Sequence, residues 1–121
     1  MNIIKTNVNP EDKKAVYKLT RSNAQRVQDI PKGTSFPVDA YMLYEEDKER
    51  KKKDGGVEMI TERILSFVSG DIKAATISDT FIKEFMFIVD LMEGDPFSII
   101  ITGGTSKGGR EFVSCELDCD A

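Results

Sequence analysis

The segment GGTSKGG, residues 103 to 109, brings two hydroxyl groups, a cation and four glycines together in one short stretch, and Arg110 follows directly. Lys107 and Arg110 can attract phosphate, while the hydroxyls of Thr105 and Ser106 and the backbone amides can donate hydrogen bonds to phosphate oxygens. Glycines also let another chain approach the backbone closely. We therefore expect a mobile loop that contacts a phosphate backbone; the alternative is a solvated surface hairpin.

The residues on both sides of this segment are typical of strands. Ile99 to Ile101 are β-branched, and Val113, Cys115 and Leu117 recur with a period of two. If these three residues face the core, Phe112 faces outward beside Arg110. A ring in that position can stack on a base, which is worth about 1–3 kcal/mol per base. We predict this role for Phe112; the alternative is that its ring packs under a loop.

Further strands are predicted before this hairpin. Residues 13–20 and 36–45 both alternate in polarity, which indicates two strands, and Tyr41 then lies opposite the apolar face of the second strand as another stacking candidate. Residues 57–68 favour a third strand after the turn signal KKKDGG, with a helix as the rival interpretation, and residues 72–77 form a short extended piece. Residues 1–12 are predicted to be a flexible arm.

One helix is predicted from Ser78 to Glu93. Ser78 has the side chain of an N-cap, and Gly94 and Pro96 end the pattern. Apolar residues recur at helical spacing on a single face, which predicts that this face packs against the core. They are Phe81, Phe85, Ile88, Val89 and Met92.

Together these elements predict one domain, residues 13–119, that is all-β with one helix. The order matches an OB-like five-stranded barrel with the helix between the third and fourth strands. Such barrels bind oligonucleotides with the loops after the first and fourth strands, which adds the first loop to the candidate site. The predicted DNA-binding residues are Arg21, Asn23, Gln25, Arg26, Tyr41, Thr105, Ser106, Lys107, Arg110 and Phe112. The lysine run Lys51 to Lys53 is either a solvated hairpin tip or a further DNA contact.

Composition excludes several classes of site. The chain of 121 residues has no histidine and only two cysteines, so the usual ligands of zinc and the usual imidazole base are lacking. We expect Cys115 in the core and Cys119 exposed. No P-loop or Rossmann glycine pattern occurs. We therefore expect no enzyme activity, cofactor or metal, and, since no long apolar run or secretion signal is seen, a cytoplasmic protein without membrane contact.

Charge is divided unevenly along the chain. The net charge is −4, but residues 1–56 carry 12 Lys and Arg against 9 Asp and Glu, whereas residues 57–121 carry 5 against 12. One region can therefore be basic on an acidic molecule. The acidic half supports an alternative function, a protein-interaction module that mimics DNA charge and inhibits a host enzyme.

Three segments resemble the single-stranded DNA-binding proteins of phi-29-type phages: KLTRSNAQ (18–25), IPKGTSF (30–36) and ITGGTSKGGREFVSCEL (101–117). The resemblance runs in order along nearly the whole chain. It implies a protein of the host cytoplasm that coats and protects displaced single strands during phage DNA replication, without sequence specificity, and that stimulates the phage DNA polymerase. It leaves the oligomeric state open.

Overall fold

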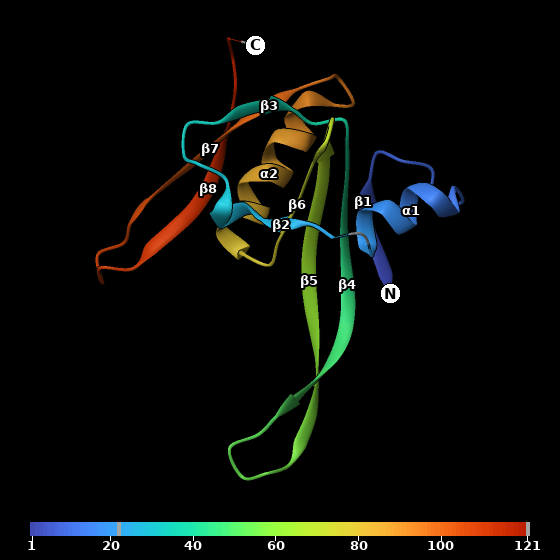
Figure 1. Cartoon of the computed structure of the whole chain (residues 1–121), viewed down its shortest axis with the longest axis vertical. Coiled ribbons are helices and arrows are strands. Elements are labelled where there is room, and N and C mark those ends of the chain that lie inside the picture. Colours follow the sequence, from blue (N-terminus) through green and yellow to red (C-terminus); the bar gives the residue numbers. More distant parts are fainter. Residues whose placement is uncertain (22, 121) are drawn as a thin grey trace.

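Two long antiparallel strands, β4 (Ala40–Lys51) and β5 (Val57–Ser69), run along the middle of the molecule in the computed structural model, which describes residues 1–21 and 23–120 (Figure 1). They belong to a five-stranded sheet of order β1-β4-β5-β6-β2, and a second sheet has the order β3-β7-β8. The remaining elements are β1 (Asn2–Thr6), α1 (Lys13–Thr20), β2 (Gln25–Arg26), the 3-10 turn η1 (Val27–Asp29), β3 (Ser35–Pro37), β6 (Ile72–Thr76), α2 (Asp79–Met92), β7 (Ser98–Thr105) and β8 (Glu111–Leu117).

The main core lies where α2 packs against the two sheets. Phe67 of β5 stacks on Phe81 and Phe85 of α2, with ring centroids 6.0 and 5.6 Å apart, and on Phe36 of β3 at 5.8 Å. Offset aromatic pairs at these distances add to the burial energy of the rings. The predicted apolar stripe of the helix is thus the core face, with Ser78 as N-cap accepting a hydrogen bond from the Phe81 amide at 3.4 Å.

The other face of the five-stranded sheet is covered by α1. Leu19 packs there with Met42, Tyr44 and Val68 in a second, smaller core. The prediction of a strand over residues 13–20 is therefore wrong. Asp12 caps a helix by accepting a hydrogen bond from the Ala15 amide at 3.2 Å, and this cap allows a pattern that fits both periods to form a helix.

The predicted strand over residues 36–45 is two strands in different sheets. β3 pairs with β7, whereas β4 pairs with β1 and β5. Between them the chain turns at Asp39, whose amide bonds to the Val68 carbonyl at 2.9 Å and whose side chain accepts from Gly70 N at 2.7 Å. Part of the expected N-terminal arm, β1, is an edge strand of the larger sheet.

The described residues form a mostly β protein with two α-helices, and its two sheets do not join into a closed barrel. α2 follows the sixth strand and precedes the last hairpin. Both the β4–β5 hairpin and the β7–β8 hairpin extend well beyond the helices (Figure 1). The molecule therefore presents two projecting hairpins, one on each sheet.

Candidate nucleic-acid interface

The β7–β8 hairpin is more regular than its glycine content suggests. Gly103, Gly104 and Thr105 continue strand β7, so the expected loop is shorter than residues 103–109. The turn itself is closed by backbone hydrogen bonds from Ser106 N to the Arg110 carbonyl, 2.8 Å, and from Gly109 N to the Ser106 carbonyl, 2.9 Å. Gly109 adopts a φ of +80°, where a side chain would be strained. Lys107 is thereby presented at the end of an ordered projection.

The register of β8 agrees with the alternation in the sequence. Val113 and Cys115 are buried, and Leu117 packs against the same core. Phe112 points the other way and is 41% exposed. An apolar ring that remains so accessible is available to a ligand.

Two glycines of β7 adapt the strand to its neighbours. A Cβ on Gly104 would lie 3.1 Å from Cζ of Phe112, so the ring rests against bare backbone. A Cβ on Gly103 would lie 2.4 Å from the Phe112 carbonyl oxygen and 2.7 Å from Cε of Lys32. At Gly103 a side chain would collide with backbone, whereas at Gly104 it would displace the ring of Phe112.

A groove of about 450 Å³ lies between β8 and the segment that contains η1. Its lining comes from three segments that are distant in sequence: the first holds Arg26, Gln28 and Lys32, the second Ser78, and the third Glu111 and Phe112. Two of these residues are cations and one is an acid. The groove thus combines an aromatic ring with positive charge, the pairing that a single nucleic-acid strand needs for base stacking and phosphate contact.

The four residues predicted in the first loop lie in different places in the structure. Arg26 reaches the groove because β2 pairs with β6, opposite Ala75. Asn23 and Gln25 are exposed but do not line it. Arg21 ends α1 and lies 3.4 Å from Glu46 in an ion pair on the α1 side of the sheet. Of the four first-loop candidates, Arg26 is therefore the one that lines the groove with Phe112.

The cations of the last hairpin lie beyond the groove. Lys107 and Arg110 are exposed and have no ion-pair partner among residues 1–21 and 23–120. Thr105 and Ser106 precede them, and the Ser106 hydroxyl accepts a hydrogen bond from Arg110 N at 3.3 Å. Lys107 and Arg110 thus add positive charge along the projecting hairpin, outside the groove.

Tyr41 does not lie at the surface, so its prediction as a stacking residue is wrong. Its side chain is 6% exposed and meets Phe85 edge to face at 5.6 Å. Burial raises the pKa of its hydroxyl, and the neighbouring charges of Lys5 and Asp90 act in opposite directions. The error arose because β4 is covered by a helix on each face, so polarity alternation could not distinguish an outer face.

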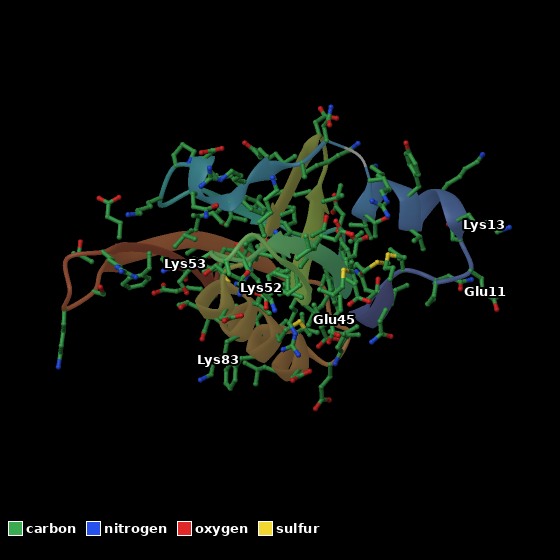
Figure 2. The ribbon with its side chains drawn as sticks, turned by 90° about the horizontal axis from the view of Figure 1, so that it is seen from below. Glu11, Lys13, Glu45, Lys52, Lys53 and Lys83 are labelled. Carbon is green, nitrogen blue, oxygen red and sulfur yellow. The ribbon has the colours of Figure 1, made fainter. Side chains whose placement is uncertain are left out.

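The lysine run lies at the end of the β4–β5 hairpin. The turn is closed by a hydrogen bond from Lys52 N to the Gly56 carbonyl at 2.7 Å. Arg50 pairs with Glu58, and Lys48 lies 2.9 Å from Glu62. Figure 2, viewed along this hairpin, shows Lys52 and Lys53 at its end, away from Lys13 on α1. The run is separate from the groove.

Four polar residues of the groove were not among the predicted site residues: Gln28, Lys32, Ser78 and Glu111. Lys32 lies in a turn between Pro31 and Gly33, and Gly33 N bonds to the Ile101 carbonyl at 2.7 Å. This contact places Lys32 across β7. The turn signal was visible in the sequence, but the pairing of β3 with β7 joins residues 61 to 65 positions apart and has no local signature.

Cys115 of β8 carries a thiol, a group that is nucleophilic when it is deprotonated. Burial, with the nearby charges of Glu84 and Glu116, raises the pKa of its thiol to about 12. It is therefore an inert core residue, as expected, and Cys119 is exposed. Among the residues that the structure describes, no group of His, Cys, Asp and Glu could hold a metal ion, and no helix is long and apolar enough to cross a bilayer.

Comparison of the chain with protein-family models, with curated proteins and with solved structures finds no match.

Proposed function

We propose that this protein binds single-stranded DNA without sequence preference, through the groove beside Phe112 and the β7–β8 hairpin. The observation that carries the proposal is the exposed ring of Phe112 on the glycine backbone of β7, beside the cations Arg26 and Lys32. Every base offers a face to a ring, so stacking on Phe112 requires no particular sequence.

Binding would combine two kinds of contact. A base stacks on Phe112, while Arg26 and Lys32 neutralise phosphates on the groove side and Lys107 and Arg110 do so along the hairpin. Glu111 lies in the same groove and opposes the accumulation of phosphate there. The net charge of −4 opposes indiscriminate attraction of DNA to the molecule as a whole. The proposal includes no catalytic step or cofactor.

The phage role and the OB-like architecture belong to the same proposal. The resemblance to the phi-29-type proteins supports coating of displaced strands in the cytoplasm of a host cell and contact with the phage polymerase. The features in favour of an OB-like arrangement are a long hairpin before α2 and a second hairpin after it. We treat the arrangement as an opened form, since the described strands lie in two sheets.

The test is a titration of a short labelled dT oligonucleotide with the protein and with Phe112→Ala. We expect the substitution to reduce the binding free energy by about 1–3 kcal/mol, the value of one stacked base. Tyr17→Ala is the matched control, since Tyr17 is a 65% exposed aromatic residue on α1, away from the groove. Equal affinities of both variants, or no binding by the unaltered protein, would refute the proposal.

A further inference from the structure

Two exposed surfaces of this chain differ in charge, and both contain apolar side chains. Lysines predominate on the first, whereas carboxylates outnumber cations by three to two in the groove along the second. The first, which we call the arm tip, is the end of the β4–β5 hairpin. Val57 and Met59 are 58% and 63% exposed there, although apolar. Val57 pairs with Lys51, so the two side chains share a face of the hairpin, and Lys52 and Lys53 form the adjoining turn. Two acids moderate this charge: Glu49 lies opposite Met59, and Asp54 in the turn accepts a hydrogen bond from Gly56 N at 2.9 Å.

The second surface, which we call the α2 face, is the solvent side of that helix. Thr80, Glu84, Phe87 and Leu91 follow one stripe of the helix. Phe87 and Leu91 are 62% and 60% exposed. Large apolar residues one turn apart and open to solvent are characteristic of interaction surfaces.

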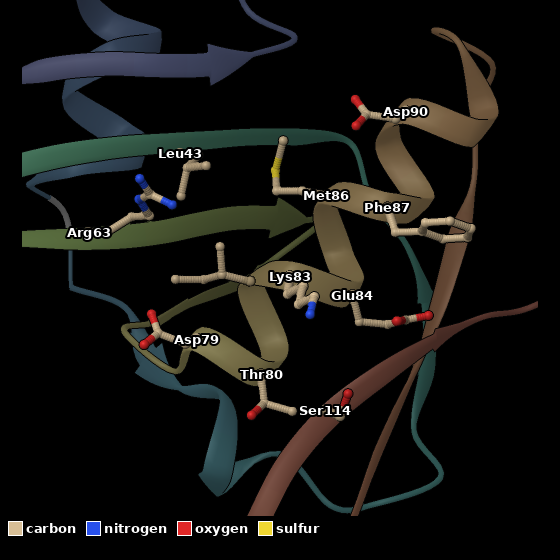
Figure 3. Close-up of a pocket in the computed structure, with 11 residues that line it drawn as sticks. Leu43, Arg63, Asp79, Thr80, Lys83, Glu84, Met86, Phe87, Asp90 and Ser114 are labelled. Carbon is tan, nitrogen blue, oxygen red and sulfur yellow. The ribbon is translucent and has the colours of Figure 1, made fainter.

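A groove of about 910 Å³ runs along the α2 face from the root of the arm, at Leu43 and Arg63, to Ser114 of β8 (Figure 3). Leu43 and Met86 supply apolar lining, and Asp79, Glu84 and Asp90 supply negative charge. Arg63 and Lys83 also line the groove; Arg63 lies 3.8 Å from Glu45, and Asp90 accepts a hydrogen bond from Lys5 at 2.8 Å.

The arm tip cannot reach the α2 face of its own molecule. The β4–β5 hairpin is stiffened by cross-strand ion pairs, Lys48 with Glu62 and Arg50 with Glu58. It projects away from α2 (Figure 1). About six residues of each strand lie beyond the covered part of the sheet, which corresponds to roughly 20 Å of extended chain. The two surfaces can therefore meet only between separate copies.

We propose that the arm tip of one copy docks in the groove beside the α2 face of a second copy. Val57 and Met59 would contact Phe87, Leu91 and the apolar lining, while Lys51 to Lys53 would lie near the carboxylates at the edge of the groove. This contact joins two different surfaces, so it is heterologous, and each copy keeps one free tip and one free groove. Copies would then add in a row.

Such a row would arrange copies side by side on a single strand, a consequence that rests on the proposed function. The self-association itself does not require DNA. The contact is small and charged, so it belongs to the weak class of interfaces and should weaken as salt screens the lysines.

Sedimentation velocity without DNA, at low salt and increasing protein concentration, tests the inference. We expect concentration-dependent association, weakened about tenfold or more by K52E/K53E and by F87S/L91S, since hot-spot residues dominate small interfaces. K13E/K14E makes the same charge change at α1 and is the matched control. A mixture of K52E/K53E with E84K/D90K should associate again, because the unaltered tip of the second variant meets the unaltered groove of the first, and at the other contact the two reversed charges attract each other.

Two results would overturn the inference: a protein that stays monomeric over the whole concentration range, or association that K52E/K53E and F87S/L91S leave unchanged. Circular dichroism identifies any variant that fails to fold. Affinity for a short oligonucleotide separates this inference from the proposed function, since F87S/L91S should bind such an oligonucleotide normally. If the unaltered protein does not bind the oligonucleotide, only the proposed function is refuted.

Discussion

The ring of Phe112 rests against the backbone of Gly104 on the neighbouring strand, where an added Cβ would come within 3.1 Å of Cζ. The contacting atom is the far end of a side chain that can rotate, so Gly104→Ala should fold with little loss of stability. The ring must move, however, and we expect weaker binding of a dT oligonucleotide. Oligonucleotide titration together with a thermal melt measures both effects.

Gly103→Ala is the matched comparison. Here the added Cβ would lie 2.4 Å from the backbone carbonyl of Phe112, which is held in the β7–β8 ladder. Backbone cannot move aside cheaply, so we expect a loss of about 1–3 kcal/mol of stability, as for an overpacked core. Equal melting temperatures for the two variants would contradict this account of the glycines.

The aromatic core predicts a large contrast along α2. Phe85 is fully buried against Phe67 and Tyr41, so Phe85→Ala should cost about 3–5 kcal/mol. Phe87, two residues later, is 62% exposed, and Phe87→Ala should change stability by less than about 0.5 kcal/mol. Denaturant melts at low protein concentration measure both; similar losses would mean that α2 is packed differently.

How far the sequence predicts this fold depends on the length of each pattern. The apolar stripe of α2 recurs over three turns, so only a helix satisfies it, and β5 was identified by the turn signal before it. Residues 13–20 are too short for this, since Val16 and Leu19 would share a helix face, whereas Ala15, Tyr17 and Leu19 would share a strand face. In this segment the N-cap at Asp12, a single hydrogen bond from the Ala15 amide, favours the helix over the strand.

The candidate site was predictable only in part, for a different reason. Phe112 followed from alternation within its own strand, which is local information. Tyr41 failed because it faces α2, where it meets Phe85, while the apolar residues on the other face of β4 are covered by α1, an element predicted as a strand. Gln28 and Lys32 reach the groove through η1 and the pairing of β3 with β7, contacts set by tertiary structure.

Alkaline pH should destabilise the protein through Cys115. Burial raises the pKa of its thiol in the folded state from an ordinary 9.0 to about 12. Between these values the unfolded chain loses the proton and the folded chain keeps it. The contribution of this thiol to the free energy of unfolding is therefore fully present below about pH 9 and is lost as the pH rises toward 12. Burial raises the pKa of Tyr41 and Tyr44 in the same direction. Melts of Cys115→Val should show a shallower decline above pH 9; an unchanged profile would assign the decline to the tyrosines.

The final prediction concerns the hairpin cations, because salt dependence counts phosphate contacts. Each contact to a single strand contributes about 0.7 to the slope of log affinity against log salt. Lys107→Ala, Arg110→Ala and Lys32→Ala should each lower the slope by about 0.7 and weaken binding about equally for all base compositions. Lys13→Ala is the control, since Lys13 lies on α1, on the opposite side of the molecule from the β7–β8 hairpin (Figure 2). A slope that falls only in Lys32→Ala would confine the strand to the groove, and unchanged slopes in all three would place the DNA backbone elsewhere.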